Sequence, residues 1–463
     1  MDDAALHFLP LGGTGEIGMN LNLYAHDGRW LMVDCGVTFE RSRDPGGRVQ
    51  MADPRFIADR RDQLDGLILT HAHMDHLGAV ADLWPVLRCP VYCTPFASFM
   101  LRDRLRELKL HRKVPLKVMR PGASVDIGPF SIQFVPITHS TLECNGLVIR
   151  AGRTTVFHTG DWKLDPEPLV GERTDEKRLR SLADLPIHAL IGDSTNATRE
   201  GTTPSEAVAR DALLRLVKAQ TKRVVVTCFA SNVARVATLC RVAEQCGRHP
   251  ILVGRSLERV MGAARRAKYL RDLPRVVPAR DAGWLPREAT LVIATGSQGE
   301  PRASLSRMAT NSYRDVLLEN GDTVIFSSKV IPGNELPIQR LKTQLRELGC
   351  AVFDEFTDPD VHVSGHPCRD DLRRMYGLVR PKWVIPTHGT PRHLAAHAEL
   401  AADLPGVGAL QCLNGQIVRV GPGPPRIVGA APVGRLERNE SEGTLVRVPA
   451  PSPPPRRRGP AKG

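Results

Sequence analysis

The chain has 463 residues, of which 42% are hydrophobic, and its 63 basic and 50 acidic residues give a formal net charge of +13. This length exceeds that of one typical domain and predicts two or three domains. The sequence has no apolar run of about 18 residues and no signal-peptide pattern at its N-terminus, which argues against a membrane-spanning or secreted protein. The positive charge favours a polyanionic partner. The ten cysteines form no C-x-x-C pair, a pattern typical of reduced thiols in the cytoplasm.

Residues 7–36 are the first predicted unit, and their alternating apolar residues indicate two strands around a glycine turn. The glycine cluster does not predict a dinucleotide-binding loop, because no suitable helix and acidic residue follow it. We expect instead a hairpin that brings backbone close to the site formed later in the chain. Asp34 ends a strand, where it is expected either to be satisfied by backbone or to support a metal-bound histidine.

Residues 64–79, LDGLILTHAHMDHLGA, combine a short buried strand with four metal-binding side chains. His71 and His73 are two positions apart, so they point the same way on an extended segment. Asp75 and His76 follow on the turn into a helix and can face a second point. Because imidazole and carboxylate groups bind zinc and similar ions, this spacing predicts two metals sharing one site. The motif resembles the metallo-β-lactamase superfamily, which implies an αββα sandwich with the metals at the edge of its sheets.

Later strands are predicted to bring further ligands to this cluster. A strand over residues 129–139 ends at His139, which would complete the first metal site with the first two histidines. Residues 146–161 give two strands and then Asp161, whose two carboxylate oxygens can bridge both metals. His158, in the same turn, is interpreted as a supporting or packing residue.

The pattern of predicted elements changes near Pro204, where a second domain is predicted to begin. An amphipathic helix capped by Ser205 is followed by strand–loop–helix units up to about residue 360, and this rhythm predicts a parallel α/β domain. Small polar residues at its strand ends either bind phosphate or form ordinary turns. These residues are Ser231, Asn232, Thr295, Gly296, Ser297 and Gln298.

The chain is expected to return to the first domain at HVSGHP, residues 362–367, where two histidines bracket a Ser-Gly turn. A helix follows, and then a strand that ends at His388. His388 would supply the missing ligand of the second metal, beside Asp75, His76 and Asp161.

Four segments follow from this layout. They are a metallo-β-lactamase domain over 1–200, an inserted domain over 201–361, a return segment over 362–430, and a Pro/Arg-rich tail over 431–463 that is expected to be disordered. Two basic stretches keep alternative interpretations. The helix predicted from Ser98 to His111 is either a solvated face or a wall that faces phosphate, and Arg456 to Arg458 either form a solvated tail or add RNA affinity.

The ordered motifs HAHMDH, PITHS, HTGDWKLD, DSTN, FASN, HVSGH and PTHG, after the opening LGGTGEIGMN, resemble the ribonuclease J family. That family is part of the β-CASP group of metallo-β-lactamase-fold nucleases. The resemblance implies an α/β fold with an inserted β-CASP domain and two zinc ions, with Mn²⁺ or Mg²⁺ as substitutes in assays. It also implies cytoplasmic hydrolysis of RNA, as a 5′-to-3′ exonuclease that prefers a 5′-monophosphate end and often cuts internally.

The resemblance assigns roles to individual positions of this sequence. Asp75 and Asp161 would position the attacking water, and His366 would assist catalysis. The implied substrate contacts are Ser231, Asn232, His362, Val363, Ser364, Gly365 and His366. The implied metal ligands are His71, His73, Asp75, His76, His139, Asp161 and His388.

Two departures from the family pattern and several alternatives remain. Family members usually carry a further C-terminal domain that aids dimerisation, and here the fold is expected to end near residue 430, which puts a homodimer in doubt. Residues 37–54 differ from the usual acidic loop, which can alter a supporting ion site. The alternatives are a small-molecule hydrolase of the superfamily, a β-CASP nuclease acting on DNA or mRNA 3′ ends, and an inactive RNA-binding subunit of a degradation complex.

Overall fold

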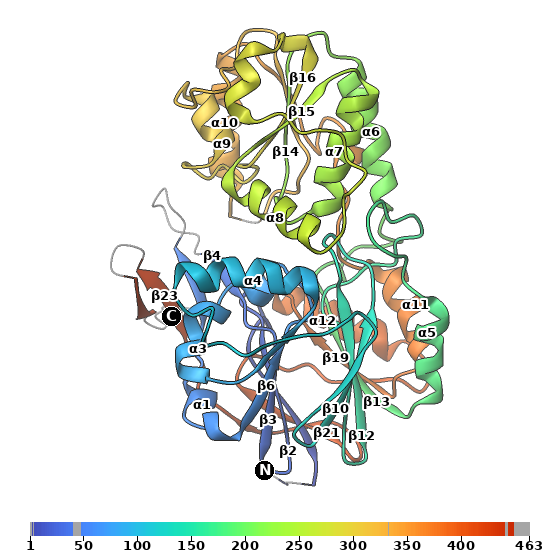
Figure 1. Ribbon diagram of the computed structural model, residues 1–463. Helices are drawn as coiled ribbons and strands as arrows, with labels where there is room; N and C mark the ends of the chain where they lie inside the picture. Colours follow the sequence, from blue (N-terminus) through green and yellow to red (C-terminus); the bar gives the residue numbers. More distant parts are fainter. Residues whose placement is uncertain (1, 3, 40–47, 332, 440–442, 449–463) are drawn as a thin grey trace, which may run out of the picture.

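The computed structural model describes residues 2, 4–39, 48–331, 333–439 and 443–448. The chain forms a two-sheet sandwich, and a smaller α/β unit lies across one end of it (Figure 1). Within the described residues, no helix combines the length and the apolar character needed to cross a membrane.

The first sheet of the sandwich has eight strands in the order β22-β21-β1-β2-β3-β6-β7-β8. Strands β1, β2 and β3 pair antiparallel, whereas β3, β6, β7 and β8 run parallel to one another. The N-terminal segment therefore forms three strands rather than the two expected, because Asp27 and Gly28 turn the chain between β2 and β3. The strands are β1 Leu6–Gly12, β2 Leu21–His26, β3 Arg29–Val33, β6 Leu64–Ile68, β7 Val91–Cys93, β8 Leu116–Val118, β21 Gln416–Gly421 and β22 Arg426–Ala430.

The second sheet has seven strands in the order β20-β19-β13-β12-β11-β10-β9. Its strands β12, β13, β19 and β20 are parallel, so their carboxyl ends meet at one edge of the sheet. The strands are β9 Ser124–Ile127, β10 Phe130–Pro136, β11 Asn145–Ala151, β12 Thr154–His158, β13 Ile187–Asp193, β19 Trp383–Thr387 and β20 Gly408–Ala409.

A hydrophobic core lies between the two sheets, and helices cover both outer faces. Phe8 and Leu31 of the first sheet pack with Phe134 and Ile191 of the second, all of them fully buried. Because each sheet has a second apolar face, the helices bury that face in turn and complete the predicted αββα sandwich. The helices are α1 Arg55–Ala58, α2 Met74–Leu77, α3 Val80–Leu87 and α4 Pro95–Glu107 on the first side, and α5 Glu176–Ser181, α11 Arg369–Val379 and α12 Pro391–Ala402 on the second.

The inserted unit is an all-parallel sheet in the order β15-β16-β14-β17-β18, as the strand–helix rhythm predicts. The side chain of Ser205 accepts a hydrogen bond from the backbone N–H of Ala207 and caps the first helix, as expected. Helices α6, α7 and α8 cover one face, and α9 and α10 cover the other (Figure 1). The elements are α6 Glu206–Lys218, β14 Val224–Thr227, α7 Val233–Gln245, β15 His249–Val253, α8 Arg255–Arg266, β16 Thr290–Ala294, α9 Ser304–Ala309, β17 Thr323–Phe326, α10 Glu335–Glu347 and β18 Ala351–Phe353.

The expectation that the fold ends near residue 430 is wrong, because a further sheet forms in the order β24-β23-β5-β4. Ion pairs between Arg438 and Asp82 and between Arg447 and Asp53 fix its C-terminal strands to the sandwich. Residues 40–47 of the departing segment 37–54 and residues 449–463 of the predicted tail, which include the three consecutive arginines, lie outside the described residues. The strands are β4 Val37–Phe39, β5 Val49–Ala52, β23 Arg435–Asn439 and β24 Thr444–Val448.

Candidate metal centre

The H-x-H-x-D-H segment crosses the end of the first sheet, and backbone contacts fix its path. The N–H groups of Asn20 and Cys35 donate to the carbonyl oxygens of Asp75 and His76 at 3.0 and 2.7 Å. A Cβ at Gly36 would lie 1.6 Å from the Asp75 carbonyl oxygen, so only glycine allows the two segments to pack this closely. The N-terminal segment therefore brings its backbone against the H-x-H-x-D-H segment, as the sequence predicts.

Three histidines form the first group of convergent donor atoms. His73 Nδ1 lies 3.2 Å from His71 Nε2 and 3.0 Å from His139 Nε2. His71 and His139 are buried. His73 and His139 come together although 66 positions separate them in the sequence. These side chains offer three nitrogen atoms within 4.8 Å of one another, which suits a single divalent ion.

Two carboxylates and two histidines form the second group. Asp75 Oδ2 lies 3.6 Å from His76 Nε2 and 3.4 Å from His388 Nε2. Asp161 Oδ2 lies 3.2 Å from His76 Nε2, and Asp161 Oδ1 lies 2.8 Å from His388 Nδ1. His388 follows β19 and Asp161 follows β12, so the parallel strands deliver both residues to the same edge.

Asp161 also reaches the first group. Its Oδ2 lies 4.0 Å from His71 Nε2 and 3.9 Å from His139 Nε2. One carboxylate thus contacts both sets of nitrogen atoms, in the position that the sequence predicts for a bridging ligand.

The chemistry of these donors fits zinc. His139 Nδ1 donates to the carbonyl oxygen of Gly365 at 2.6 Å, and His76 Nδ1 donates to Asp34 Oδ2 at 2.7 Å. These bonds fix the tautomer and leave each Nε2 lone pair pointing at the group. Asp161 Oδ1 and both nitrogens of His388 are buried yet have no well-aligned hydrogen bond to any residue that the structure describes, as expected for atoms that bind a cation.

The protonation states support the same interpretation. Burial lowers the pKa of His71 and of His139 well below the usual value, so both imidazoles are neutral at pH 7, the form that can bind a cation. Burial alone would raise the pKa of Asp161, but His388 and His76 hold it well below its usual range. Burial would lower the pKa of His388, and the Asp161 carboxylate instead raises it to about 10. A bound cation would replace the protons that now balance these carboxylates.

Asp34 and Asn20 surround the ligands with a second layer of hydrogen bonds. Asp34 accepts from the backbone N–H and the hydroxyl of Thr70, both at 2.8 Å, and Thr70 Oγ1 lies 3.0 Å from His71 Nδ1. Asp34 therefore contacts one histidine of each group, directly or through Thr70, which favours the second of the two roles considered for it, although it also accepts a backbone bond. Asn20, which the sequence gives no reason to select, donates its Nδ2 hydrogen to the Asp75 carbonyl oxygen at 3.1 Å and lies 3.1 Å from His76 Nε2.

A pair formed by the partly exposed His366 and the buried Asp193 lies beside the donor groups. His366 Nδ1 and Asp193 Oδ2 are 2.7 Å apart, and Asp193 is the last residue of β13. Burial lowers the pKa of His366, but the charge and hydrogen bond of Asp193 more than offset this, so its pKa is raised. His366 also lies 3.8 Å from Asp161, which places it next to the second donor group. Asp193 is the first residue of the DSTN motif, and the sequence alone gives it no catalytic role.

The HVSGH turn is bonded into the sandwich through Asn196. Its Nδ2 donates to Ser364 Oγ at 2.8 Å and to the carbonyl oxygen of His366 at 3.0 Å. Ser364 Oγ also accepts from the His366 N–H at 3.2 Å, and within the described chain no bond uses this hydroxyl as a donor. Val363 is buried, and Gly365 packs so closely on His139 that an added Cβ would lie 2.7 Å from the ring.

Ser231 and Asn232 are not part of the donor groups. They precede α7, and the side-chain oxygen of Asn232 accepts from the Arg235 N–H at 2.9 Å as the helix cap. Cation charges gather instead around His362, where burial and then Arg235, Lys329 and Lys163 lower the pKa of the imidazole. His158 bonds to the Tyr24 hydroxyl at 2.9 Å and lies outside the groups, in keeping with its predicted packing role.

Comparisons with known proteins agree with this geometry. Residues 29–227 match a beta-lactamase superfamily domain, 221–345 match the ribonuclease J beta-CASP domain, and 360–409 match a Zn-dependent metallo-hydrolase RNA specificity domain. The chain is 43% identical to ribonuclease J of Sinorhizobium meliloti over 96% of its length and 79% of that protein. It is 39% identical to ribonuclease J of Mycolicibacterium smegmatis over 93% of its length and 77% of that protein.

A solved structure of a protein of unknown function from Enterococcus faecalis V583 shares the fold, with a TM-score of 0.61 at 14% identity, covering 89% of this chain and 99% of that one. The sandwich, the inserted parallel domain and the histidine–aspartate groups define a metallo-β-lactamase-fold hydrolase of the β-CASP group. The chain belongs to the ribonuclease J family, and as a member of that family it is a zinc-dependent ribonuclease.

Proposed function

We propose that the protein binds two zinc ions and hydrolyses RNA from the 5′ end towards the 3′ end, with additional internal cleavage. The observation that carries this proposal is the contact of Asp161 with both donor groups. One group has His71, His73 and His139, and the other has Asp75, His76, Asp161 and His388. A carboxylate shared in this way is typical of two-metal sites that cleave phosphodiesters.

The surrounding residues divide the chemical step between them. Zinc, when bound, supplies Lewis-acid chemistry that activates water and offsets charge on the phosphate. Asp75 and Asp161 orient the water whose oxygen attacks phosphorus. As the bond from phosphorus to the leaving oxygen breaks, His366 gives that oxygen its proton. Asp193 keeps His366 protonated and oriented for this transfer.

The 5′-monophosphate preference rests on the HVSGH turn. The Ser364 oxygen accepts from Asn196 and from the His366 backbone N–H. Its hydroxyl hydrogen can therefore be donated to a phosphate oxygen. The positive charges near His362 favour a dianionic end group. Ser231, which is partly exposed, remains a proposed contact, whereas the helix-capping role of Asn232 limits that residue to a supporting one.

Two alternatives make different predictions. A β-CASP nuclease for DNA or mRNA 3′ ends would cleave such substrates as well as it cleaves RNA with a 5′ phosphate. An inactive RNA-binding subunit of a degradation complex would lack one or more of the proposed ligands, and the convergence of all seven side chains supports the active enzyme instead. The ten free cysteines support a reducing compartment, and we propose the cytoplasm as the site of action.

A time course on RNA labelled at its 5′ end tests the proposal. The zinc-loaded protein should release mononucleotides, with some internal fragments, and a chelator should stop both. RNA with a 5′-monophosphate should react faster than the same RNA with a 5′-hydroxyl or 5′-triphosphate. Equal rates on the three ends would contradict the proposed phosphate contacts, and cleavage that survives metal removal would contradict the metal-dependent mechanism.

A further inference from the structure

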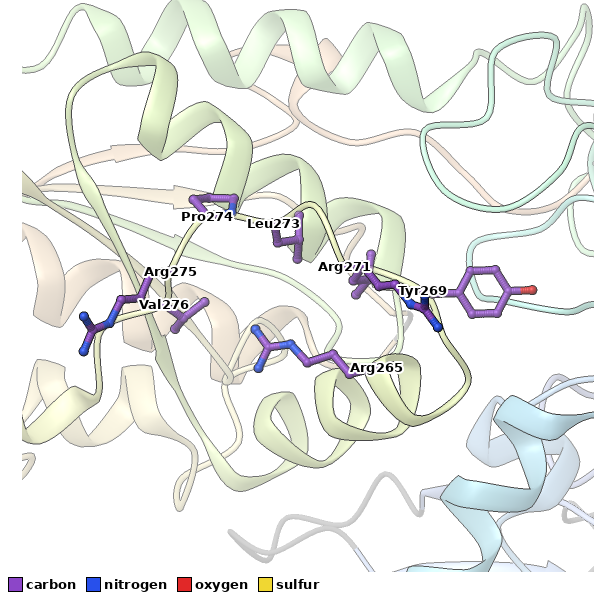
Figure 2. Close-up of a pocket in the computed structure, with 8 residues that line it drawn as sticks. Arg265, Tyr269, Arg271, Leu273, Pro274, Arg275 and Val276 are labelled. Atoms are coloured by element: carbon purple, nitrogen blue, oxygen red, sulfur yellow. The ribbon is translucent and has the colours of Figure 1, made fainter.

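A hollow lined by arginines lies on the inserted domain, outside the metal centre. It has a volume of about 470 Å³ and is formed by the end of α8 and the segment that follows it. Arg265, Arg271 and Arg275 line it together with Tyr269, Leu273 and Val276 (Figure 2). All three arginines are exposed, and in the described part of the chain no ion pair or hydrogen bond neutralises their guanidinium groups.

The chain around the hollow is held in place. Lys268 and Leu270 have φ angles of 72° and 62°, in a region that residues with side chains rarely adopt. Such a backbone persists only where surrounding contacts enforce it, and here Leu270 is 7% exposed while Leu273 and Val276 pack against the core. The arginines therefore project from a fixed loop rather than from a free one.

The acidic residue nearest in sequence to these arginines, Asp272, is already paired with another arginine. Asp272 lies in the same segment, but its carboxylate pairs with Arg241 at 2.7 Å. The positive charge of the hollow is consequently not cancelled from within. Uncancelled arginines beside the apolar side chains of Leu273 and Val276 suit a phosphate backbone with bases that can stack on guanidinium planes.

The hollow adjoins the junction with the sandwich. Arg266, next to Arg265, pairs with Asp103 of α4 at 2.8 Å, and Arg259 pairs with Glu107 of α4 at the same distance. The acidic residues of α4 therefore hold α8 at the junction, while Arg104 and Arg106 of α4 pair with the same two carboxylates, Glu107 and Asp103.

Tyr269 extends the connection towards the metal centre. In Figure 2 it points away from Arg265 and Arg275, and its hydroxyl bonds to the side chain of Glu143. Glu143 accepts from the Phe96 N–H at 2.7 Å and lies on the loop that begins with the proposed ligand His139. The hollow is thus linked, through Tyr269 and Glu143, to the rim of the proposed cleavage site.

We propose that Arg265, Arg271 and Arg275 bind the phosphodiester backbone of a single-stranded RNA at a point outside the catalytic centre. This inference rests on the proposed function, because it takes the same polymer to be the substrate. A long RNA would occupy both the metal centre and the hollow, whereas an RNA of a few nucleotides would reach only the metal centre. The hollow would then set the affinity for long substrates without taking part in the chemical step.

The test compares a triple glutamine variant of these three arginines with a charge-matched control, Lys222, Arg340 and Arg346 each changed to glutamine. The control residues are exposed, lie on the same domain and have no ion pair among the described residues. The hollow variant should raise KM about tenfold for an RNA of about 30 nucleotides and leave kcat and the KM of a five-nucleotide RNA unchanged. Its binding to the long RNA should also lose about two units of log–log salt dependence, since single strands lose about 0.7 per contact.

Three results would overturn the inference. One is equal KM and salt dependence in the hollow variant and the control, and another is a rise in KM that is the same for both RNA lengths. The third is competition by AMP or inorganic phosphate that the hollow variant abolishes, because it would assign the hollow to a free phosphate compound. If the unaltered protein cleaves no RNA, the proposed function fails, and fluorescence anisotropy with the long RNA still tests the hollow by itself.

Discussion

Replacing Asp34 by asparagine is expected to weaken zinc binding without unfolding the protein. Asp34 has a φ angle of 63°, which asparagine also tolerates, so the backbone need not move. An asparagine oxygen can still accept from the Thr70 N–H, but an amide NH₂ would stand where Oδ2 now accepts from Thr70 Oγ1 and His76 Nδ1. The imidazole of His76 would then take the other tautomer and carry its proton on Nε2, the atom that faces the metal.

The size of this effect follows from the bonds involved. Loss of a partner behind a metal-bound histidine lowers metal affinity or activity about tenfold to a hundredfold, which is about 1.4–2.7 kcal/mol. The free energy of unfolding of the metal-free protein should fall by only about 1–3 kcal/mol, because the Thr70 hydroxyl and the imidazole can both reorient.

Equilibrium dialysis against buffered zinc, together with initial rates on labelled RNA, measures both quantities. Asp65→Asn is a matched control, because Asp65 is bound to Arg29 on the surface and not to the ligands. If Asp34→Asn binds zinc and cleaves RNA as the control does, Asp34 does not orient His76 for metal binding and the assignment of the second group is wrong.

Three further predictions concern other residues. Asp161→Asn should reduce zinc at both positions and lower kcat/KM by more than about a hundredfold, as metal analysis and RNA kinetics would show, and loss of one ion only would contradict its bridging role. Asp193→Asn should lower kcat by about tenfold to a hundredfold with normal zinc content. His366 must be protonated to donate its proton, and Asp193 raises its pKa. Activity should therefore fall as pH rises through that pKa, and in the variant this fall should occur at lower pH. An unchanged pH profile would argue against the role of His366 as the acid. Arg235→Met should destabilise the protein by about 3–5 kcal/mol in urea unfolding, since it leaves the buried Glu206 unpaired, and a change below about 1 kcal/mol would show that the pair is not stabilising.

The convergence of the two donor groups could be predicted from the sequence because each of their residues lies at a recognisable place. His71, His73, Asp75 and His76 sit together after one buried strand, and their spacing alone indicates two facing directions. His139, Asp161 and His388 follow strands β10, β12 and β19 of the second sheet, which run in the same direction and bring their carboxyl ends to one edge. Local sequence patterns were therefore enough to identify most residues of the two donor groups.

The partners of these ligands could not be predicted in the same way. Asp193 and His366 are 173 positions apart, and a strand-end aspartate is common without any catalytic role. Asn20 reaches His76 only because Gly36 allows a close approach of two loops. Such contacts depend on the packing of distant segments, for which a single sequence has no local signal.

The C-terminal strands were missed for a related reason. Strand β23 has charged residues at three of its five positions and pairs with β5, whose Gln50 lies opposite Glu437. Before that partner is known, such a sequence looks like the start of a charged tail. Its strand conformation comes from tertiary pairing rather than from intrinsic preference.

The shared use of Asp161 by two ions is the central claim, and a crystal structure of the zinc-loaded protein, with data collected on both sides of the zinc absorption edge, tests it most directly. We expect two anomalous peaks, one bound by His71, His73 and His139 and the other by Asp75, His76 and His388, with Asp161 contacting both. A single peak, or two peaks without Asp161 between them, would contradict the account.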